Sequence, residues 1–207
     1  MIAVEKDSRF LKHLERIPGD VKVLRANALD VIGSLRFDRI ISNIPYAISE
    51  PLIRKLPSLN FRKAVLTVPK RFAMRLAAKK PDALYSELSF FTQTFFLPEM
   101  CFEVPRSSFF PRPGTASVVI ALTPRKRSLA GDIFMRRKSK LRNAILQALT
   151  GGRGRKKMTK REARKLINML PINKILDKRV RELNLDELES VGCEMKKHTR
   201  TDNIRTS

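Results

Sequence analysis

The first third of the chain alternates short apolar runs with segments of helical periodicity, and this order constrains the fold more than any other feature. The apolar runs are short and bounded by polar or turn residues, which is typical of buried strands. The expected strands are residues 1–4, 21–24, 37–42 and 64–68, and the expected helices are residues 8–16, 51–56 and 69–78. Strands that alternate with helices predict a parallel α/β sheet.

The middle of the chain changes pattern. Residues 85–96 carry apolar side chains at helical spacing, including four phenylalanines. Such a row could stack on bases, but at this spacing it is more typical of a face packed in the core. Residues 97–104 and 117–122 are typical of two strands joined by the proline-rich loop 105–114. We expect them to form an antiparallel edge on the parallel sheet.

Basic and acidic residues are unevenly distributed along the chain. The whole chain carries 43 Lys and Arg against 20 Asp and Glu, and residues 123–207 hold 24 of the basic residues but only 9 of the acidic ones. This balance favours a polyanionic partner, usually a nucleic acid, over the rival partner, a membrane surface. The alternative explanation for the excess of basic residues is a charged helix face exposed to solvent. We expect a core domain at 1–123 and a basic, RNA-facing helical domain at 124–207.

The basic segment has clear helical signals. Ile133, Phe134, Leu141, Ile145 and Leu149 indicate one face of a single helix. A Gly/Arg/Lys loop is expected at 151–157. Thr159 with Glu162, and Asn184 with Glu187, are typical of helix N-termini, and Gly192 is expected to end the last helix.

Other classes of site find little support. Cys101 and Cys193 are far apart and do not have the spacing of a zinc site or a disulfide framework, and His13 and His198 have no partners at metal-ligand spacing. We therefore expect no metal. The sequence also shows no signal peptide and no apolar run long enough to span a membrane. These features predict a cytoplasmic protein with free thiols.

The tetrapeptide Asn43-Ile44-Pro45-Tyr46 follows a predicted strand. Ligands of open α/β sheets bind outside the carboxyl ends of the strands. An asparagine oxygen and a backbone carbonyl there can accept the hydrogens of an exocyclic amine, which makes its nitrogen more nucleophilic. Proline stiffens the backbone, and tyrosine can stack on an unpaired base. The alternative is an ordinary strand exit with Tyr46 in the core.

Polar residues also follow the two preceding strands. Glu5 stands where an acidic residue of a nucleotide-binding sheet contacts ribose hydroxyls, and Asn27-Ala28 stand where an adenine edge would lie. Each could be a solvated turn residue. Their shared position at strand ends, together with Asn43, favours one ligand site.

Five spaced segments make the chain resemble the rRNA adenine dimethyltransferase family, its archaeal branch especially. They are V-E-K-D at 4–7, N-I-P-Y at 43–46 continuing I-S-E-P at 48–51, V-P-K-R-F-A-M-R-L at 68–76, V-P-R-S-S-F-F-P-R-P at 104–113 and R-R-K-S-K-L-R-N-A-I-L at 136–146. The resemblance implies a Rossmann-like methyltransferase sheet with a small all-helical C-terminal domain.

The resemblance also implies an activity. Such enzymes use S-adenosylmethionine to dimethylate two adjacent adenosines near the end of small-subunit rRNA. Glu5 would bind the cofactor ribose, Asn27 and Ala28 its adenine, and Asn43 would line the same pocket. Asn43 and the backbone around Ile44 and Pro45 would accept from the target amine, without a general base. Tyr46 and Phe109 would stack on the target base. The phosphates of rRNA, or of a pre-ribosomal small subunit, would contact Arg136, Arg137, Lys138, Lys140 and Arg142. We expect a monomer.

Three departures qualify the resemblance. The chain starts at what resembles the family's second strand, so we expect the first strand and the glycine-rich cofactor loop to be missing. Asn27 stands where the family usually has aspartate, and Glu87 where arginine is usual. The alternative function is therefore a catalytically degenerate ribosome-assembly factor that binds RNA without methylating it.

Overall fold

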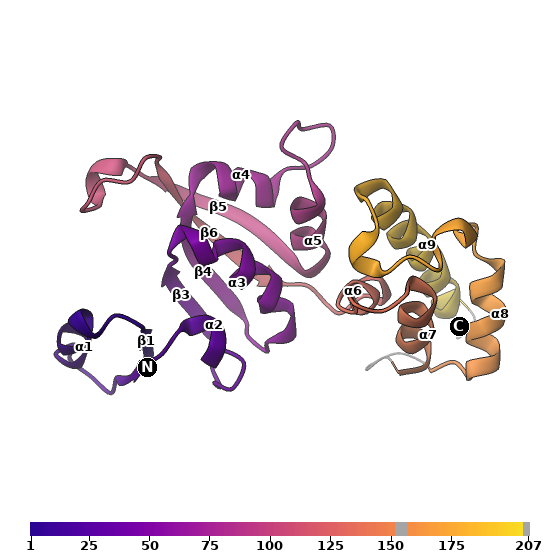
Figure 1. Cartoon of the computed structure of the whole chain (residues 1–207), viewed down its shortest axis with the longest axis horizontal. Coiled ribbons are helices and arrows are strands. Elements are labelled where there is room, and N and C mark those ends of the chain that lie inside the picture. Colours follow the sequence, from indigo (N-terminus) through magenta and orange to yellow (C-terminus); the bar gives the residue numbers. More distant parts are fainter. Residues whose placement is uncertain (152–156, 205–207) are drawn as a thin grey trace.

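The protein is an elongated molecule with a sheet-containing body at one end and a group of helices at the other (Figure 1). Its computed structural model describes residues 1–151 and 157–204, with the backbone alone for 198–204. The chain passes from the body to the helices after strand β6 (Ser117–Pro124). Each end has its own cluster of buried apolar side chains.

The described strands form two sheets, one of two strands and one of four. Strands β1 (Ile2–Glu5) and β2 (Lys22–Arg25) form a parallel pair. Strands β3 (Arg39–Asn43), β4 (Lys63–Pro69) and β5 (Phe96–Val104) join β6 in a second sheet, in the order β3–β4–β6–β5. Among the described residues, β1 pairs only with β2 and β3 only with β4, so each keeps one unpaired edge.

The larger sheet is mixed, as predicted. β3 runs parallel to β4, whereas β6 is antiparallel to both β4 and β5. β6 lies inside the sheet, and its residues 117–122 are all buried. β5 forms the edge and is largely exposed, with an irregularity between Met100 and Phe102.

Helices α3 (Ser49–Lys55), α4 (Lys70–Ala77) and α5 (Glu87–Phe95) pack against one face of this sheet (Figure 1). In β4, buried residues alternate with exposed or half-buried ones, because every second side chain points toward these helices. The predicted core face of the phenylalanine-rich segment is confirmed, since Phe91 is 5% exposed. Phe90 packs instead against the helical domain.

The two-stranded sheet carries helices α1 (Ser8–Glu15) and α2 (Ala28–Val31), and neither helix has a buried residue. The sequence did not predict α2. The side-chain oxygen of Asn27 accepts from the N–H of Leu29 at 3.1 Å and so caps this single turn.

The helical domain contains α6 (Leu129–Phe134), α7 (Leu141–Gly151), α8 (Lys160–Met169) and α9 (Leu185–Ile204). The prediction of a single helix across 133–149 is wrong, because α6 ends at Phe134. Backbone hydrogen bonds join residues 137, 139 and 141 to residues 178–181, which prevents a helix there. Short 3-10 turns lie at Tyr46–Ile48, Leu56–Ser58, Arg106–Ser108, Asn173–Ile175 and Val180–Glu182.

Helix-start signals were more reliable than the helix-end signal. The capping box of Thr159 and Glu162 is present, and Asn184 and Glu187 exchange the same pair of hydrogen bonds. Gly192, however, does not end α9, which continues to Ile204. A Cβ at this glycine would lie 3.4 Å from the ring of Phe90, so α9 packs against α5 at this position. Part of the expected loop at 151–157 lies outside the described residues.

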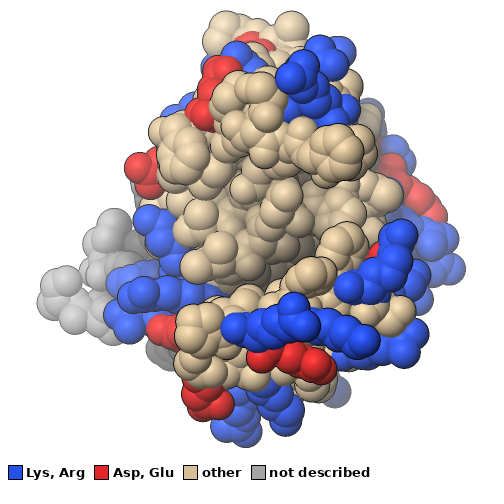
Figure 2. Space-filling view, turned by 90° about the vertical axis from the view of Figure 1, so that its left-hand side faces the viewer, with Lys and Arg blue, Asp and Glu red and all other residues tan. Residues whose placement is uncertain are grey.

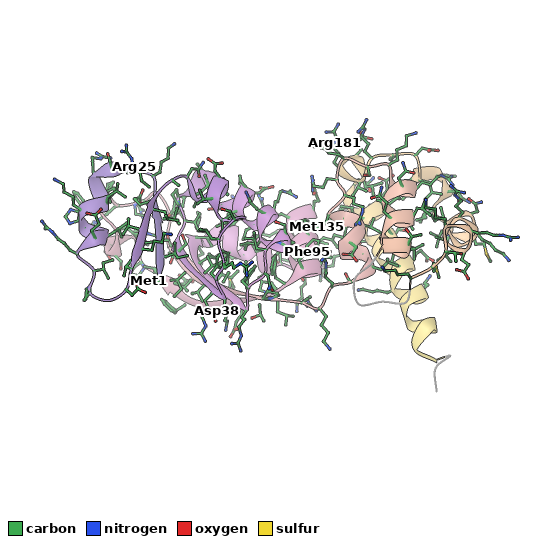
Figure 3. The ribbon with its side chains drawn as sticks, turned by 90° about the horizontal axis from the view of Figure 1, so that it is seen from below. Met1, Arg25, Asp38, Phe95, Met135 and Arg181 are labelled. Carbon is green, nitrogen blue, oxygen red and sulfur yellow. The ribbon has the colours of Figure 1, made fainter. Side chains whose placement is uncertain are left out.

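The body and the helical domain meet through aromatic side chains. The rings of Phe90 and Phe134 are 5.4 Å apart in an edge-on arrangement. Gly131 leaves room for the ring of Phe95, since a Cβ there would lie 3.0 Å from it. Figure 3 shows Phe95 and Met135 at this junction.

Candidate functional site

The end of β3 is fixed to the body by Ile44. Its side chain is 2% exposed, and its N–H donates to the carbonyl of Thr67 on β4 at 3.2 Å. Asn43 and Pro45, on either side of it, are exposed. The buried isoleucine therefore holds the backbone while the flanking residues face outward.

Two acceptors remain available at this strand end. The carbonyl of Pro45 accepts from the N–H of Ile48 at 3.0 Å, so it is engaged in the following turn. Within the described residues, neither the Ile44 carbonyl nor the Asn43 side chain has a hydrogen-bond partner. Of the two backbone carbonyls considered from the sequence, that of Ile44 is thus the better placed to accept from an amine.

Tyr46 begins the turn after the strand and is 43% exposed, so it is not a core residue. Its hydroxyl lies 3.0 Å from the hydroxyl of Ser117, which is buried at the start of β6. Sequence reasoning missed Ser117. Its position directly after the proline-rich loop was the only available signal, and that signal does not reveal a partner 71 residues away.

Ser117 also stands at the base of the hairpin formed by residues 105–116. Arg106 donates from Nε to the carbonyl of Pro113 at 2.8 Å and closes this hairpin across its width. Beyond that bond, Phe109 is half-buried, whereas Phe110 is fully exposed. Figure 1 shows the hairpin projecting from the body on the same side as α1.

The predicted cofactor residues follow β1 and β2. Glu5 ends β1, and one of its carboxylate oxygens accepts from the N–H of Asp7 at 2.8 Å. Asp7 caps α1, and its hydrogen bond with the Arg9 side chain lowers the pKa of Asp7 to about 2. Asn27 uses its oxygen to cap α2, and Ala28 is the first residue of that helix.

These contacts fit S-adenosylmethionine in part. The second carboxylate oxygen of Glu5 can accept from a ribose hydroxyl. The oxygen of Asn27 is already engaged, so this side chain offers its NH2 group, which is a donor. An adenine amino group is also a donor, and only the ring nitrogens of the adenine can accept from Asn27.

The target-base residues and the cofactor residues stand on different sheets, since β3 and β1 are not paired. Figure 2 shows the side of the molecule that carries α1 and the hairpin. The middle of this face is hollowed and lined by uncharged side chains, with Lys and Arg side chains above and below. Such a surface suits a base and its flanking phosphates.

The five basic residues predicted to contact RNA begin in the turn between α6 and α7, not along one helix. Arg136 donates to Gln147 and to the carbonyl of Asp132, and Arg142 donates to Asn168. Lys140 lies 3.6 Å from Asp177, and Lys138 is exposed. Most of these cations therefore have partners within the helical domain.

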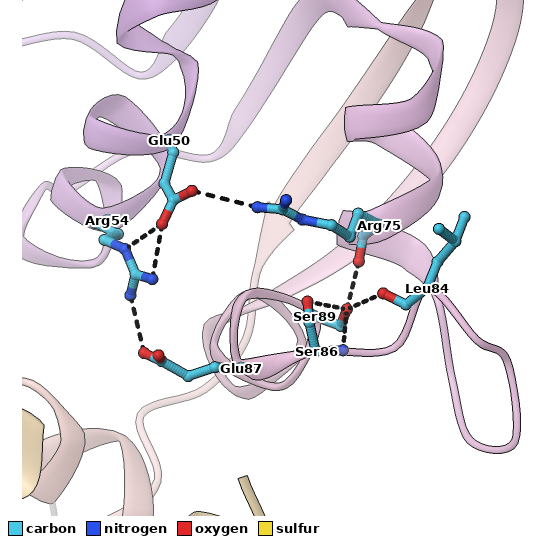
Figure 4. A network of polar contacts seen from close by, with 7 residues as sticks. All are labelled: Glu50, Arg54, Arg75, Leu84, Ser86, Glu87 and Ser89. Atoms are coloured by element: carbon cyan, nitrogen blue, oxygen red, sulfur yellow. Dashed lines mark hydrogen bonds and ion pairs between the residues drawn. The ribbon is translucent and has the colours of Figure 1, made fainter. Parts of the chain in front are cut away.

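Glu87 belongs to a network of ion pairs in the body (Figure 4), and Arg137 of the helical domain also pairs with it. Glu87 accepts from Arg137 and from Arg54, each at 3.2 Å. Glu50 in turn pairs with Arg54 and Arg75. Glu87 thus links the body and the helical domain through opposite charges.

The described residues contain no group of three or more His, Cys, Asp or Glu able to hold a metal ion. None of the described helices combines the length and apolar character needed to cross a membrane. Cys101 and Cys193 are both free and exposed.

Comparison with known proteins gives one consistent result. The model of the ribosomal RNA adenine dimethylase family matches residues 1–180. A probable ribosomal RNA small subunit methyltransferase A of Thermococcus onnurineus is 29% identical over 200 residues, which cover 94% of this chain and 73% of that protein. Its counterpart from Thermococcus kodakarensis is 30% identical, with 94% and 72% covered.

Two solved structures of RNA methyltransferases have a similar fold. A dimethyladenosine transferase from Plasmodium falciparum aligns with a TM-score of 0.59 and 26% identity, covering 95% of this chain and 82% of that one. The 23S rRNA methyltransferase ErmE aligns with a TM-score of 0.55 at 16% identity, which supports the fold alone. The Rossmann-like methyltransferase fold predicted from the sequence is confirmed.

Proposed function

The chain belongs to the ribosomal RNA adenine dimethylase family, and we propose that it dimethylates adjacent adenosines near the 3′ end of small-subunit rRNA. The names of its relatives and of a 26% identical solved structure support this activity. The observation that carries the proposal is the pair of free acceptors, the Asn43 side chain and the Ile44 carbonyl, at the end of β3.

The two acceptors suit the chemistry of an adenine amino group. Its lone pair is delocalised into the ring, so the nitrogen is a weak nucleophile. Donation of both hydrogens to Asn43 and Ile44 favours a more tetrahedral nitrogen and stabilises the positive charge that develops during attack. S-adenosylmethionine, when bound, supplies the methyl group. The nitrogen proton then passes to water, so no side chain need act as a base.

Tyr46 would hold the target base by stacking, and its bond to Ser117 fixes the direction of the ring. Phe109 would cover the other face of the base from the hairpin. Correct placement of the amine relative to the methyl donor supplies much of the rate of such transfers.

On the cofactor side, Glu5 would accept from the ribose hydroxyls. Asn27 and Ala28 would line the adenine site, and Asn43 would border both halves of the pocket. Since Asn27 offers a donor, we propose that it contacts a ring nitrogen of the adenine.

The RNA would be held by phosphate contacts with the helical domain. Lys138 is exposed, and the remaining candidates, Arg136, Arg137, Lys140 and Arg142, would exchange their present partners for phosphate oxygens. The substrate would be the rRNA or a pre-ribosomal small subunit, and the protein would act as a monomer in the cytoplasm.

The decisive test is Asn43→Ala, with the exposed Asn60→Ala as the matched control. We expect Asn43→Ala to lower methyl transfer from labelled S-adenosylmethionine to small-subunit rRNA by about 100-fold or more, the usual cost of losing one polar contact to a reacting centre. The Kd for RNA should stay unchanged in both variants. Unchanged transfer by Asn43→Ala, or RNA binding without transfer by the native protein, would refute the proposal; the second result would indicate an RNA-binding assembly factor.

A further inference from the structure

The carbonyl of Ile44 is free for a reason that lies on the neighbouring strand. β3 and β4 are parallel, with Asn43 opposite Thr67, and the N–H of Ile44 donates to the carbonyl of Thr67. In a parallel ladder, the carbonyl of the same residue accepts from the N–H two positions further along the neighbouring strand. That position is 69, and it is occupied by proline, which has no N–H.

The other side of β4 supports this geometry. Lys70 donates its N–H to the carbonyl of Ala116, just before β6, at 2.9 Å. Successive backbone amides of a strand point to opposite sides, so the nitrogen of residue 69 faces β3 rather than β6. Residue 69 is therefore the one position of β4 whose amide would pair with Ile44, and proline removes that amide.

We propose that Pro69 is a positioning residue, which keeps the Ile44 carbonyl unpaired so that it can accept from the target amine. This inference rests on the proposed function. Any other residue at position 69 would supply an N–H and extend the ladder by one hydrogen bond to this carbonyl. A carbonyl oxygen has two lone pairs, so the target amine could still donate to Ile44 beside the new N–H. Its hydrogen bond would be weaker, because the two donors would share one oxygen. The expected loss of rate is accordingly partial.

The geometry can be tested without any activity. In the variant Pro69→Ala, the new amide should exchange its hydrogen at least about 100-fold more slowly than an unstructured peptide, because a ladder bond protects it. The amide of Lys70 in the same spectrum is the internal reference for a bonded position. If the new amide at position 69 exchanges as fast as in an unstructured peptide, no bond forms to Ile44 and the proposal is wrong, whatever the protein methylates.

The catalytic effect is tested with Pro69→Ala and Pro69→Val, because both restore the N–H with different side chains. Each should lower kcat about five- to thirty-fold and leave the KM for RNA unchanged, as expected for a weakened contact to the reacting group. Pro124→Ala is the matched control, since it changes a strand-end proline at the opposite end of the sheet. All three should unfold in urea in a single cooperative transition, which shows that they fold.

Native kcat in Pro69→Ala with a protected amide at position 69 would overturn the proposal, and so would an equal loss in Pro124→Ala. If the native protein transfers no methyl group, the proposed function fails, but the exchange experiment still reports on the carbonyl of Ile44. The two failures are therefore distinguishable.

Discussion

The two sheets of the body differ in how much of them is buried. The four-stranded sheet packs against three helices, and its central strand has six consecutive buried residues, 117–122. The two-stranded sheet and its helices contain no buried residue at all. The residues proposed to hold the target base stand on the first sheet, and those proposed to hold the cofactor stand on the second.

This difference has a functional meaning. A site needs its acceptors held within a fraction of an ångström, and burial provides that constraint. For the target-base residues, the buried side chain of Ile44 provides this constraint. Glu5 and Asn27 depend on local backbone bonds instead. On β3, the edge residue Ile41 is 83% exposed, so this edge of the larger sheet is poorly covered.

The largest expected effect concerns stability. Leu66→Ala removes a fully buried side chain from β4 and should lower the free energy of unfolding by about 2–5 kcal/mol. Val4→Ala, in the half-buried strand β1, should cost less than about 1 kcal/mol. Urea unfolding of the two variants measures both values. Equal losses would mean that the two sheets are equally well packed, which would remove the basis of the comparison.

A second prediction strengthens the weaker half of the site. Asn27→Asp keeps a cap on α2 and adds a second carboxylate oxygen that can accept from the adenine amino group. The Kd for S-adenosylmethionine, measured by calorimetry, should fall about five- to ten-fold, as for one added charge-assisted hydrogen bond. Asn60→Asp is the control for charge alone. A matching gain in that control would show that Asn27 does not contact the adenine.

A third and smaller effect concerns Tyr46. Ser117→Ala removes the partner of its hydroxyl without exposing new surface, because Ser117 is buried. We expect kcat/KM for RNA to fall about three- to six-fold, the value of one ordinary hydrogen bond. Ser107→Ala, in the exposed part of the hairpin, is the control and should keep the native value. Fluorescence of a 2-aminopurine at the target position would report a looser stack in Ser117→Ala alone.

The smallest effect is a pH dependence confined to the two-stranded sheet. Hydrogen bonding to Arg9 lowers the pKa of Asp7 from 3.8 to about 2, so the folded state favours the charged carboxylate. Its stabilisation is therefore present above pH 3.8 and is lost as the pH falls through about 2. A carboxyl NMR titration should give this midpoint, and Arg9→Gln should raise it. An unchanged midpoint in Arg9→Gln would exclude Arg9 as the cause.

Local signals in the sequence determined much of the fold. Periodicity located the strands of the body and α1, and the residue pairs Thr159–Glu162 and Asn184–Glu187 located two helix starts. These signals succeed because a cap or a buried face is made by residues a few positions apart. The tetrapeptide at 43–46 was found for the same reason, since a strand end and the residues after it are contiguous.

Other features were decided by contacts between distant segments. The break between α6 and α7 comes from backbone pairing with residues 178–181, and Gly192 lies within α9, beside the ring of Phe90. Ser117 and Tyr46 meet across 71 residues of chain. Pro69 is adjacent to the Ile44 carbonyl only through the register of β3 and β4.

The sequence by itself thus determined which chemical groups the site contains: an asparagine oxygen, a stiff backbone and an aromatic ring at one strand end. Only the tertiary structure decided which of those groups are free. Hydrogen bonds engage the Pro45 carbonyl and the Asn27 oxygen and leave the Ile44 carbonyl open. The physical reason is that the register of β3 and β4 brings position 69 opposite the Ile44 carbonyl, and the proline at that position has no N–H to donate.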